Sequence, residues 1–320
     1  MTARHQPAGD LAGAGLVILA AACFGTLGPL SRFAGDAGVS SLAIVAWRAA
    51  LGALLVGGFI VVRAAAGGTR PVSFGALPPR DRWFILAAAA ANTVLNFAAF
   101  VAFERITIAL TLLVFYLYPA FVAVISTVWF GERLDALRWG ALGVSLVGMA
   151  LVVFQAPSGG GFDLLGIGLA FLAALMQVFY VLAARHGFAH VPGAQAGAMT
   201  MGGAAILYLG IAVVLGQLPA MAQPTASTDA LVPVVLAGTV GAGIPTVAYI
   251  VGIRRLGPSR AAILATFEPV VGVLLAAMLL AEQPTPLQLI GGILIIAAGV
   301  ILQLRPTAEV AEHEAVGDPD

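Results

Sequence analysis

The sequence predicts an all-α integral membrane protein in which ten transmembrane helices form two inverted repeats of five helices. Three observations support this fold class. The chain of 320 residues is 61% hydrophobic and only 9% charged, with a mean hydropathy of +1.03, whereas a soluble domain carries about 25% charged residues. Ten segments are apolar and long enough to cross a bilayer. One proline-centred motif occurs twice, at an offset of 150 residues.

The first five predicted spans are runs of about 20 mostly apolar residues, the length that a bilayer requires. They cover residues 11–33, 40–62, 83–103, 107–129 and 137–154. Residues that cap helix N-termini lie at four of the starts, and these are Asp10, Ser40, Thr107 and Asp135. Pro29 interrupts the first span and Pro119 the fourth.

The second five spans follow the same pattern. They cover residues 163–184, 197–216, 231–252, 259–280 and 287–304. The expected caps are Asp163, Asp229, Ser259 and Thr285, and Pro286 suits the first helical turn of the last span. Pro245 interrupts the eighth span and Pro269 the ninth.

The duplication divides the chain at a short linker, residues 155–162. Residues 11–154 form the first repeat and residues 163–304 the second, with an N-terminal tail at 1–10 and a polar, acidic tail at 305–320 that we expect to be disordered. When Pro119 is set over Pro269, Arg105 falls on Arg255 without a gap. Internal duplication is the usual construction of secondary transporters.

The arginines predict the orientation. With both tails in the cytoplasm, twelve arginines lie on or near the cytoplasmic side, and only Arg32 and Arg105 lie on the outer side. Because each repeat has an odd number of helices, the second repeat enters the membrane in the opposite direction. We therefore expect a multi-pass protein of the cell membrane with cytoplasmic N- and C-termini.

The composition also limits the chemistry. All 15 basic residues are arginine, so a Schiff-base lysine and a Walker-type phosphate loop are absent. The zero net charge gives no sign of a nucleic-acid partner. The single cysteine, Cys23, forms no intramolecular disulfide, and His186 and His190 lack a third ligand nearby. We expect no metal, no cofactor and no enzymatic activity.

Two ionisable residues lie deep within predicted spans. At 1.5 Å per residue, Arg48 lies ~12 Å from the outer end of its helix and Glu268 ~14 Å from the inner end of its own, so both fall near the midplane. Charges at this depth line a cavity or pair with each other, and the sequence leaves both readings open. Glu268 is also a candidate for proton coupling, which pairing with Arg48 would oppose.

Further polar side chains at similar depth are candidates for a substrate site. Asn92 and Asn96 are four residues apart and share one helix face. The other candidates are Tyr118, Gln177, Tyr180 and Tyr249, with Tyr116 as a neighbour of Tyr118. Hydrogen bonds between helices are the alternative role for all of them.

Pro119 and Pro269 are candidate hinges. Each removes a backbone hydrogen bond and frees the carbonyl four residues earlier, at Phe115 and Ala265. Freed carbonyls at mid-depth bind polar substrates or mark gates, and a passive kink is the alternative.

Other residues have expected structural roles. Glu132 and Glu282 end the fourth and ninth spans as loop anchors. Small residues at 140–143 and 291–292 permit close packing of the fifth and tenth spans, either within the bundle or in a homodimer.

Taken together, these motifs resemble those of the EamA-type members of the drug/metabolite transporter superfamily. The resemblance covers roughly residues 11–304 and rests on Trp47-Arg48, Tyr118-Pro119, Gly131-Glu132-Arg133, Phe267-Glu268-Pro269 and Ala281-Glu282. It implies a basket of ten helices around a central cavity, lined mainly by helices 1–4 and 6–9. It also implies alternating access and, for many bacterial members, export of amino acids or related small metabolites.

We therefore expect a secondary transporter that exports a small polar metabolite, with that solute and the lipid bilayer as its partners. Efflux of cationic or hydrophobic drugs is the first alternative, with Glu268 as the partner of the cation. A membrane sensor or scaffold that moves no solute is the alternative from another class. An intramembrane enzyme is disfavoured because no catalytic cluster is found in the spans.

Overall fold

In the computed structural model of the protein, every predicted span consists mainly of helix in the residues that the structure describes. The structure describes residues 7–106, 111, 114–131, 134–153, 163–188, 190–279 and 285–304. Within these ranges the chain forms helices and no strand. The all-helical fold is therefore confirmed.

Seven helical segments are long and apolar enough to cross a membrane. They are Leu11–Asp36, Ser41–Ala65, Pro79–Ala102, Leu164–His186, Gly193–Val214, Thr228–Leu256 and Pro258–Leu279. The other three predicted spans contain shorter described apolar helices, at Tyr118–Phe130, Ala136–Leu151 and Leu289–Ala298. The count of ten membrane spans thus stays a prediction.

Helix capping explains where several helices begin. The Ser40 hydroxyl accepts a hydrogen bond from the Ala43 N–H, 3.4 Å away, before α3 (Ser41–Ala65). Asp163 caps α8 (Leu164–His186) by accepting from the Leu165 N–H at 2.8 Å. This bond is the largest cause of a lowered pKa of the Asp163 carboxyl. Asp163 also accepts from Arg105 Nε at 2.8 Å, which joins the end of the first repeat's α4 (Pro79–Arg105) to the start of the second repeat.

Three predicted caps are wrong. Asp10 lies inside α1 (Pro7–Gly25), which begins earlier than expected. Ser227, rather than Asp229, accepts from the Ala230 N–H and caps α10 (Thr228–Gly238). Ser259 lies inside α12 (Pro258–Ala265), because a proline occupies the first position of that helix. Thr107 lies outside the described residues.

The first and ninth predicted spans each break into two shorter helices, close to Pro29 and Pro269. In the first span, α1 and α2 (Leu27–Asp36) meet at Thr26, three residues before Pro29. In the ninth, α12 and α13 (Glu268–Leu279) are separated by Thr266 and Phe267, so Pro269 is the second residue of α13. There its missing N–H needs no intrahelical partner. The proline starts a new half-helix instead of kinking a continuous one.

The other two interruptions have the same character. A turn at Tyr116 and Leu117 precedes α6 (Tyr118–Phe130), in which Pro119 is the second residue. In the eighth span, a π-helical turn, Thr239–Gly243, separates α10 from α11 (Ile244–Leu256), and Pro245 is again the second residue. Whether the breaks at Pro119 and Pro269 act as hinges stays a prediction.

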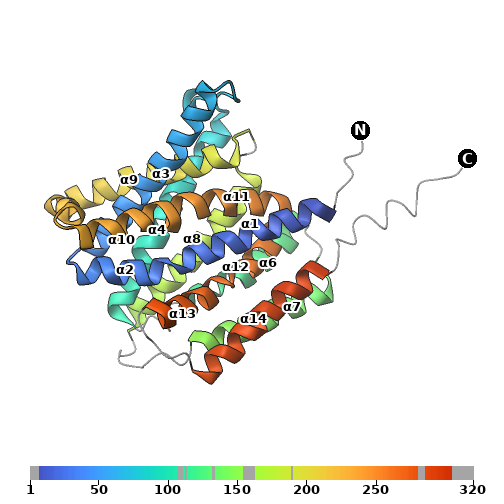
Figure 1. Ribbon diagram of the computed structural model, residues 1–320. Helices are drawn as coiled ribbons and strands as arrows, with labels where there is room; N and C mark the ends of the chain where they lie inside the picture. Colours follow the sequence, from blue (N-terminus) through green and yellow to red (C-terminus); the bar gives the residue numbers. More distant parts are fainter. Residues whose placement is uncertain are drawn as a thin grey trace, which may run out of the picture.

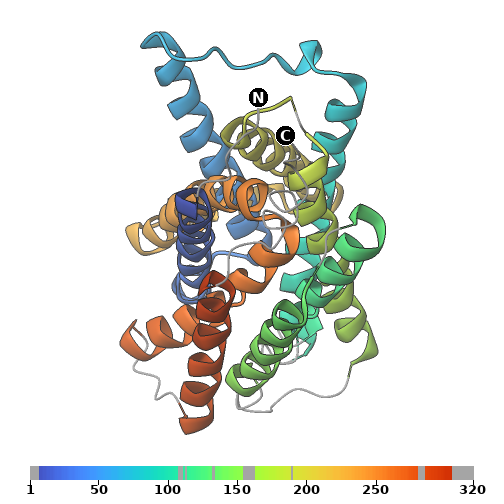
Figure 2. The ribbon, with the colours of Figure 1, turned by 90° about the vertical axis from the view of Figure 1, so that its right-hand side faces the viewer.

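The helices pack in antiparallel pairs that mix the two repeats (Figure 1). α1 lies against α11, α3 against α9 (Gly193–Val214), α4 against α8, and α7 (Ala136–Val153) against α14 (Pro286–Leu304). The α7–α14 pair stands along one edge of the bundle in both views (Figures 1 and 2). The start of α1 and the end of α14 lie at the same end of the bundle, which is called the terminal end below.

Close packing of α7 and α14 depends on Gly148 rather than on the predicted Gly140 and Gly143. A Cβ at Gly148 would lie 2.7 Å from the Gly291 carbonyl oxygen, whereas a Cβ at Gly143 would meet nothing within 4 Å. The predicted contact between the fifth and tenth spans is therefore made within the bundle.

Replacing Gly148 with alanine is expected to destabilise the protein by about 1–3 kcal/mol, because backbone must shift to admit the methyl group. The measurement is thermal unfolding in detergent, where the midpoint should fall by several degrees. Gly143→Ala on the same helix is the matched control and should leave the midpoint unchanged or raise it, since alanine favours helix. Equal midpoints for the two variants would contradict this account of the α7–α14 contact.

Candidate functional site

A cavity of about 140 Å³ lies in the interior of the bundle. Its lining residues come from the first four and the sixth to ninth predicted spans, and none of them from α7 or α14. All eight side chains predicted as substrate ligands line it, namely Arg48, Asn92, Asn96, Tyr118, Gln177, Tyr180, Tyr249 and Glu268. The structure thus brings the candidates together, and their role in binding substrate stays a prediction.

The cavity lies where the two repeats meet. Four pairs of lining residues are 150 positions apart in the chain, the offset of the duplication, and they are Leu27 with Gln177, Asn92 with Ala242, Asn96 with Thr246, and Tyr118 with Glu268. The two halves of the chain therefore contribute equivalent backbone positions. Their side chains differ, so the cavity is chemically asymmetric.

One wall of the cavity is built around Arg48. Arg48 Nη2 donates to Asn96 Oδ1 at 2.5 Å. Asn96 Nδ2 in turn donates to the backbone oxygen of Asn92 at 2.7 Å and to its Oδ1 at 2.9 Å. These two acceptors fix which atom of the Asn96 amide faces Arg48. A guanidinium has five N–H donors, and Asn96 is the one acceptor of Arg48 among the described residues, so other donors remain for an anionic group in the cavity.

The N-terminal part of α3, which carries Arg48, is held in place by a segment of the second repeat. The indole Nε1 of Trp47 donates to the Met221 carbonyl at 2.8 Å, and the Ser40 N–H donates to Gln223 Oε1 at 2.8 Å. Both acceptors belong to the short helical segment η2 (Leu218–Thr225). These contacts fix the position of α3 next to the cavity.

The other charged group in the described lining of the cavity is Glu268. It is the first residue of α13, where the helix dipole favours a carboxylate. Arg48 and Glu268 both line the cavity, yet no ion pair joins them in the part of the chain that the structure describes. The sequence left open whether Arg48 and Glu268 pair with each other or line a cavity. In this conformation they line a cavity and do not form an ion pair.

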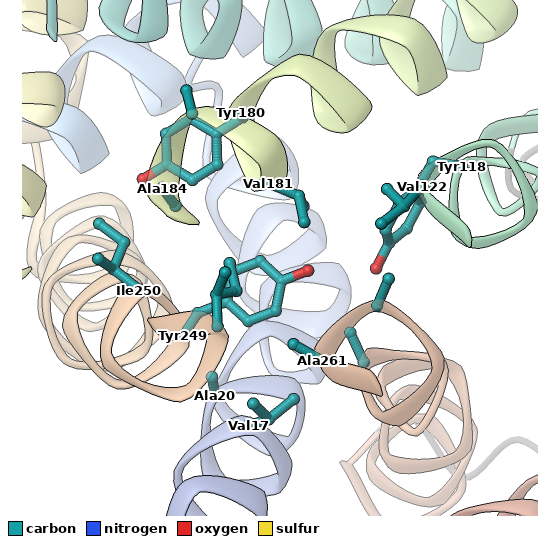
Figure 3. Packing of buried hydrophobic residues seen from close by; sticks show 14 of the residues in the cluster. Val17, Ala20, Tyr118, Val122, Tyr180, Val181, Ala184, Tyr249, Ile250 and Ala261 are labelled. Atoms are coloured by element: carbon teal, nitrogen blue, oxygen red, sulfur yellow. The ribbon is translucent and has the colours of Figure 1, made fainter. Parts of the chain in front are cut away.

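Six of the other lining residues are tyrosines or phenylalanines. The rings of Phe115 and Tyr118 lie 5.4 Å apart, and Phe24 meets Tyr249 edge to face at 6.3 Å. Figure 3 shows the hydroxyls of Tyr118 and Tyr249 pointing toward one another, whereas the hydroxyl of Tyr180 points away from them, toward Ala184. The Tyr249 side chain is only 3% exposed, and its hydroxyl has no hydrogen-bond partner among the described residues. The hydroxyl nevertheless lies close to the polar side chains of Tyr118 and Gln177, so it belongs to the polar lining of the cavity.

Two polar lining residues were not predicted. Tyr208 lines the cavity from α9, and its hydroxyl donates to the Thr93 carbonyl at 3.3 Å. Thr246 lines it from α11. A tyrosine inside a predicted span was the signal for Tyr208, whereas nothing distinguished Thr246. The other additional lining residues are apolar, and they are Phe24, Leu27, Ala49, Leu95, Phe115, Met201 and Ala242.

The remaining candidates lie elsewhere. Tyr116 is buried against Phe115, with ring centroids 5.4 Å apart, and is not among the cavity residues, although its side chain interacts with that of Glu268 behind the lining. His186 stacks on Phe130 at 4.0 Å, and His190 Nδ1 lies 3.1 Å from Asp81, so the two histidines face different partners. Glu132 and Glu282 lie outside the described residues.

A buried hydrophobic cluster separates the cavity from the terminal end of the bundle. Val181 and Ile250 directly follow the cavity residues Tyr180 and Tyr249 along α8 and α11, and both are fully buried. Val17 and Ala261 complete the packing there (Figure 3). All residues of α12 are buried as well. Buried side chains therefore pack between the cavity residues and the terminal end.

Comparisons with known proteins agree with this architecture. A solved crystal structure superposes with a TM-score of 0.76, covering 91% of this chain and 96% of its own, at 21% sequence identity. That likeness shows the fold. A search of curated proteins found no match.

The family comparison is more specific. The model of the EamA-like transporter family matches residues 11–154 and, a second time, residues 164–304. The two matches together cover most of the chain, and one match falls in each half. The chain therefore belongs to the EamA-like transporter family, and it is a multi-pass membrane transporter of the drug/metabolite transporter type.

Proposed function

We propose that the protein is a secondary transporter that exports a small polar metabolite, such as an amino acid or a derivative, across the cell membrane. The observation that carries this proposal is the shared cavity of Arg48 and Glu268. A guanidinium with free donors suits a carboxylate, and a carboxylate on the other wall suits an ammonium group. A zwitterion satisfies both charges at once, and the asparagine and tyrosine groups suit its remaining polar atoms.

Alternating access gives the cavity its transport role. With the tails in the cytoplasm, the cluster around Val181 and Ile250 closes the cavity on the cytoplasmic side. Opening that side requires α12 and its neighbours to separate, and the helix breaks at Pro119 and Pro269 are the natural hinges. Both breaks lie beside the cavity residues Tyr118 and Glu268, so a substrate there would contact the moving elements.

Glu268 is the candidate for coupling to protons. It is the one acidic residue in the described lining of the cavity. A carboxylate that holds either a proton or the ammonium group of the substrate cannot hold both. Because proton and substrate compete for Glu268, the binding of one releases the other. An exporter that is powered by inward movement of protons requires this exchange.

Efflux of monocationic drugs has less support, because Arg48 lies in the same cavity. A cation that enters must approach the positive charge of Arg48. The apolar and aromatic lining would accept the body of a drug, so the charge of the ligand is what distinguishes the two functions.

The test is ligand-dependent thermal stabilisation of the purified protein, with amino acids, sugars, nucleosides and cationic dyes as ligands. A ligand that binds only the folded state raises the melting temperature by mass action, by an amount that grows with its concentration over Kd. We expect a rise with at least one zwitterionic amino acid. A rise with cationic dyes alone would contradict metabolite export and favour drug efflux. No rise with any solute would contradict the proposal and favour a sensor or scaffold.

A further inference from the structure

A second charged feature lies at the terminal end, in and around the loop between α3 and α4. Four arginines occur within 20 residues, Arg63, Arg70, Arg80 and Arg82, and they are called the loop arginines below. The one acidic residue in this stretch is Asp81, which is only 2% exposed. It accepts a hydrogen bond from the His190 N–H at 3.0 Å. The acid is thus engaged by the α8–α9 loop, and the arginines dominate the surface charge.

The loop arginines have no acidic partner among the described residues. Other arginines at this end of the bundle are used inside the protein. Arg254 donates to the carbonyls of Ala184, Phe188 and Val191 at 2.7 to 3.2 Å. In contrast, the loop arginines form no ion pair with a described carboxylate, and Arg80 lies over the ring of Phe84 at 5.7 Å. Their charge is available to an external anion.

The surroundings of these arginines are typical of a membrane surface. The loop between α3 and α4 runs along the periphery of the bundle, at the top of Figure 2. It is held there by Gln195 of α9, which donates to the Val72 carbonyl and accepts from the Val72 N–H at 3.1 Å. Beside the arginines, Trp83 is 68% exposed and Phe74 is 37% exposed. Exposed aromatic side chains next to arginines are found where a protein meets lipid headgroups.

We infer that the loop arginines bind the phosphate groups of anionic phospholipids, such as phosphatidylglycerol, with Trp83 and Phe74 inserted at the headgroup level. Guanidinium groups make strong, charge-assisted hydrogen bonds to phosphate. Basic segments next to a transmembrane helix are attracted to anionic leaflets. This inference does not depend on the nature of the transported solute.

The test uses the full chain, purified in detergent and titrated with phosphatidylglycerol, with phosphatidylcholine of the same acyl chains, or with inorganic phosphate. The readout is the melting temperature as a function of lipid concentration. We expect phosphatidylglycerol to bind more tightly than phosphatidylcholine and inorganic phosphate to have no effect. Each arginine removed should weaken phosphatidylglycerol binding about fivefold. The effect should shrink at high salt, because salt screens exposed charges.

Three variants make the assignment specific. Replacing all four loop arginines with glutamine should leave only the affinity shown by phosphatidylcholine, whereas replacing them with lysine should retain most of the preference, since lysine also binds phosphate as a point charge. Arg255→Gln, at an exposed position on α11, is the control and should bind like the wild type. Equal binding of the two lipids by the wild type would overturn the inference. So would an unchanged preference in the glutamine variant, or stabilisation by inorganic phosphate alone. If the glutamine variant does not fold, the fivefold weaker phosphatidylglycerol binding expected of each single variant carries the test.

Discussion

Replacing Arg48 with alanine is expected to abolish transport while leaving the protein folded and inserted. Arg48 supplies the only cationic side chain in the described lining of the cavity, and its free N–H donors have no protein acceptor there other than Asn96. Removing a buried charged partner from a ligand carboxylate costs about 2–5 kcal/mol. The initial rate of exchange at limiting substrate, measured in proteoliposomes, should therefore fall by at least 30-fold, to about the background of empty vesicles.

Two further variants separate binding from structure. Arg48→Lys keeps the charge but cannot hold both Asn96 and a ligand with one planar fork, so its rate should lie between those of the wild type and the alanine variant. Arg255→Ala, outside the cavity, should transport normally. Wild-type rates in the alanine variant, with normal amounts of inserted protein, would rule out a role for Arg48 in the transport site.

Replacing Glu268 with glutamine is expected to change which ligands the protein accepts. The substitution preserves size and removes the negative charge from the cavity that Glu268 shares with Arg48. A zwitterionic substrate should lose about 10–100-fold in affinity, corresponding to the 1.5–3 kcal/mol of a hydrogen bond to a charged group. An analogue that keeps the carboxylate but lacks the ammonium group should bind the variant at least as well as it binds the wild type.

The reciprocal result is expected for Arg48→Gln, which should retain an amine analogue without a carboxylate. The measurement is the rise in melting temperature of both variants with three ligands: the zwitterion, the analogue without an ammonium group and the analogue without a carboxylate. Equal losses for the amine-free analogue and the zwitterion in Glu268→Gln would argue against direct contact with the ammonium group. If Glu268 also carries the coupling proton, Glu268→Gln should lose accumulation driven by a pH gradient while exchange of saturating substrate continues.

Hydropathy and the internal repeat were sufficient to predict the helical fold. Each predicted span is mainly helical where the structure describes it, because an apolar segment in lipid must satisfy its own backbone hydrogen bonds. Proline positions also located the interruptions. Proline alone did not distinguish a kink from a break, since that depends on whether the preceding residues, such as Thr266 and Phe267, form a turn. The cap of α10 was assigned wrongly because Asp229 and Ser227 are equally plausible from the sequence.

The candidate site was predicted through charge and depth. A charge at the midplane is expensive in lipid, so Arg48 and Glu268 stood out, and all eight candidate residues line one cavity. The connections between them could not be predicted. The choice of Asn96 as acceptor for Arg48, and the position of Tyr208 over Thr93, follow from how α3, α4 and α9 pack. Phe24, Phe115 and Tyr208 were not predicted as lining residues, because aromatic residues are common throughout apolar spans.

The central claim is that the cavity between Arg48 and Glu268 is the path of the solute, and thiol labelling tests it most directly. In a Cys23→Ser background, Ala49→Cys places the only thiol on the cavity wall beside Arg48. A small charged thiol reagent should modify this residue, modification should block transport, and saturating substrate should slow the modification severalfold. Transport that continues at the unmodified rate after complete labelling, or labelling that substrate does not slow, would contradict the claim.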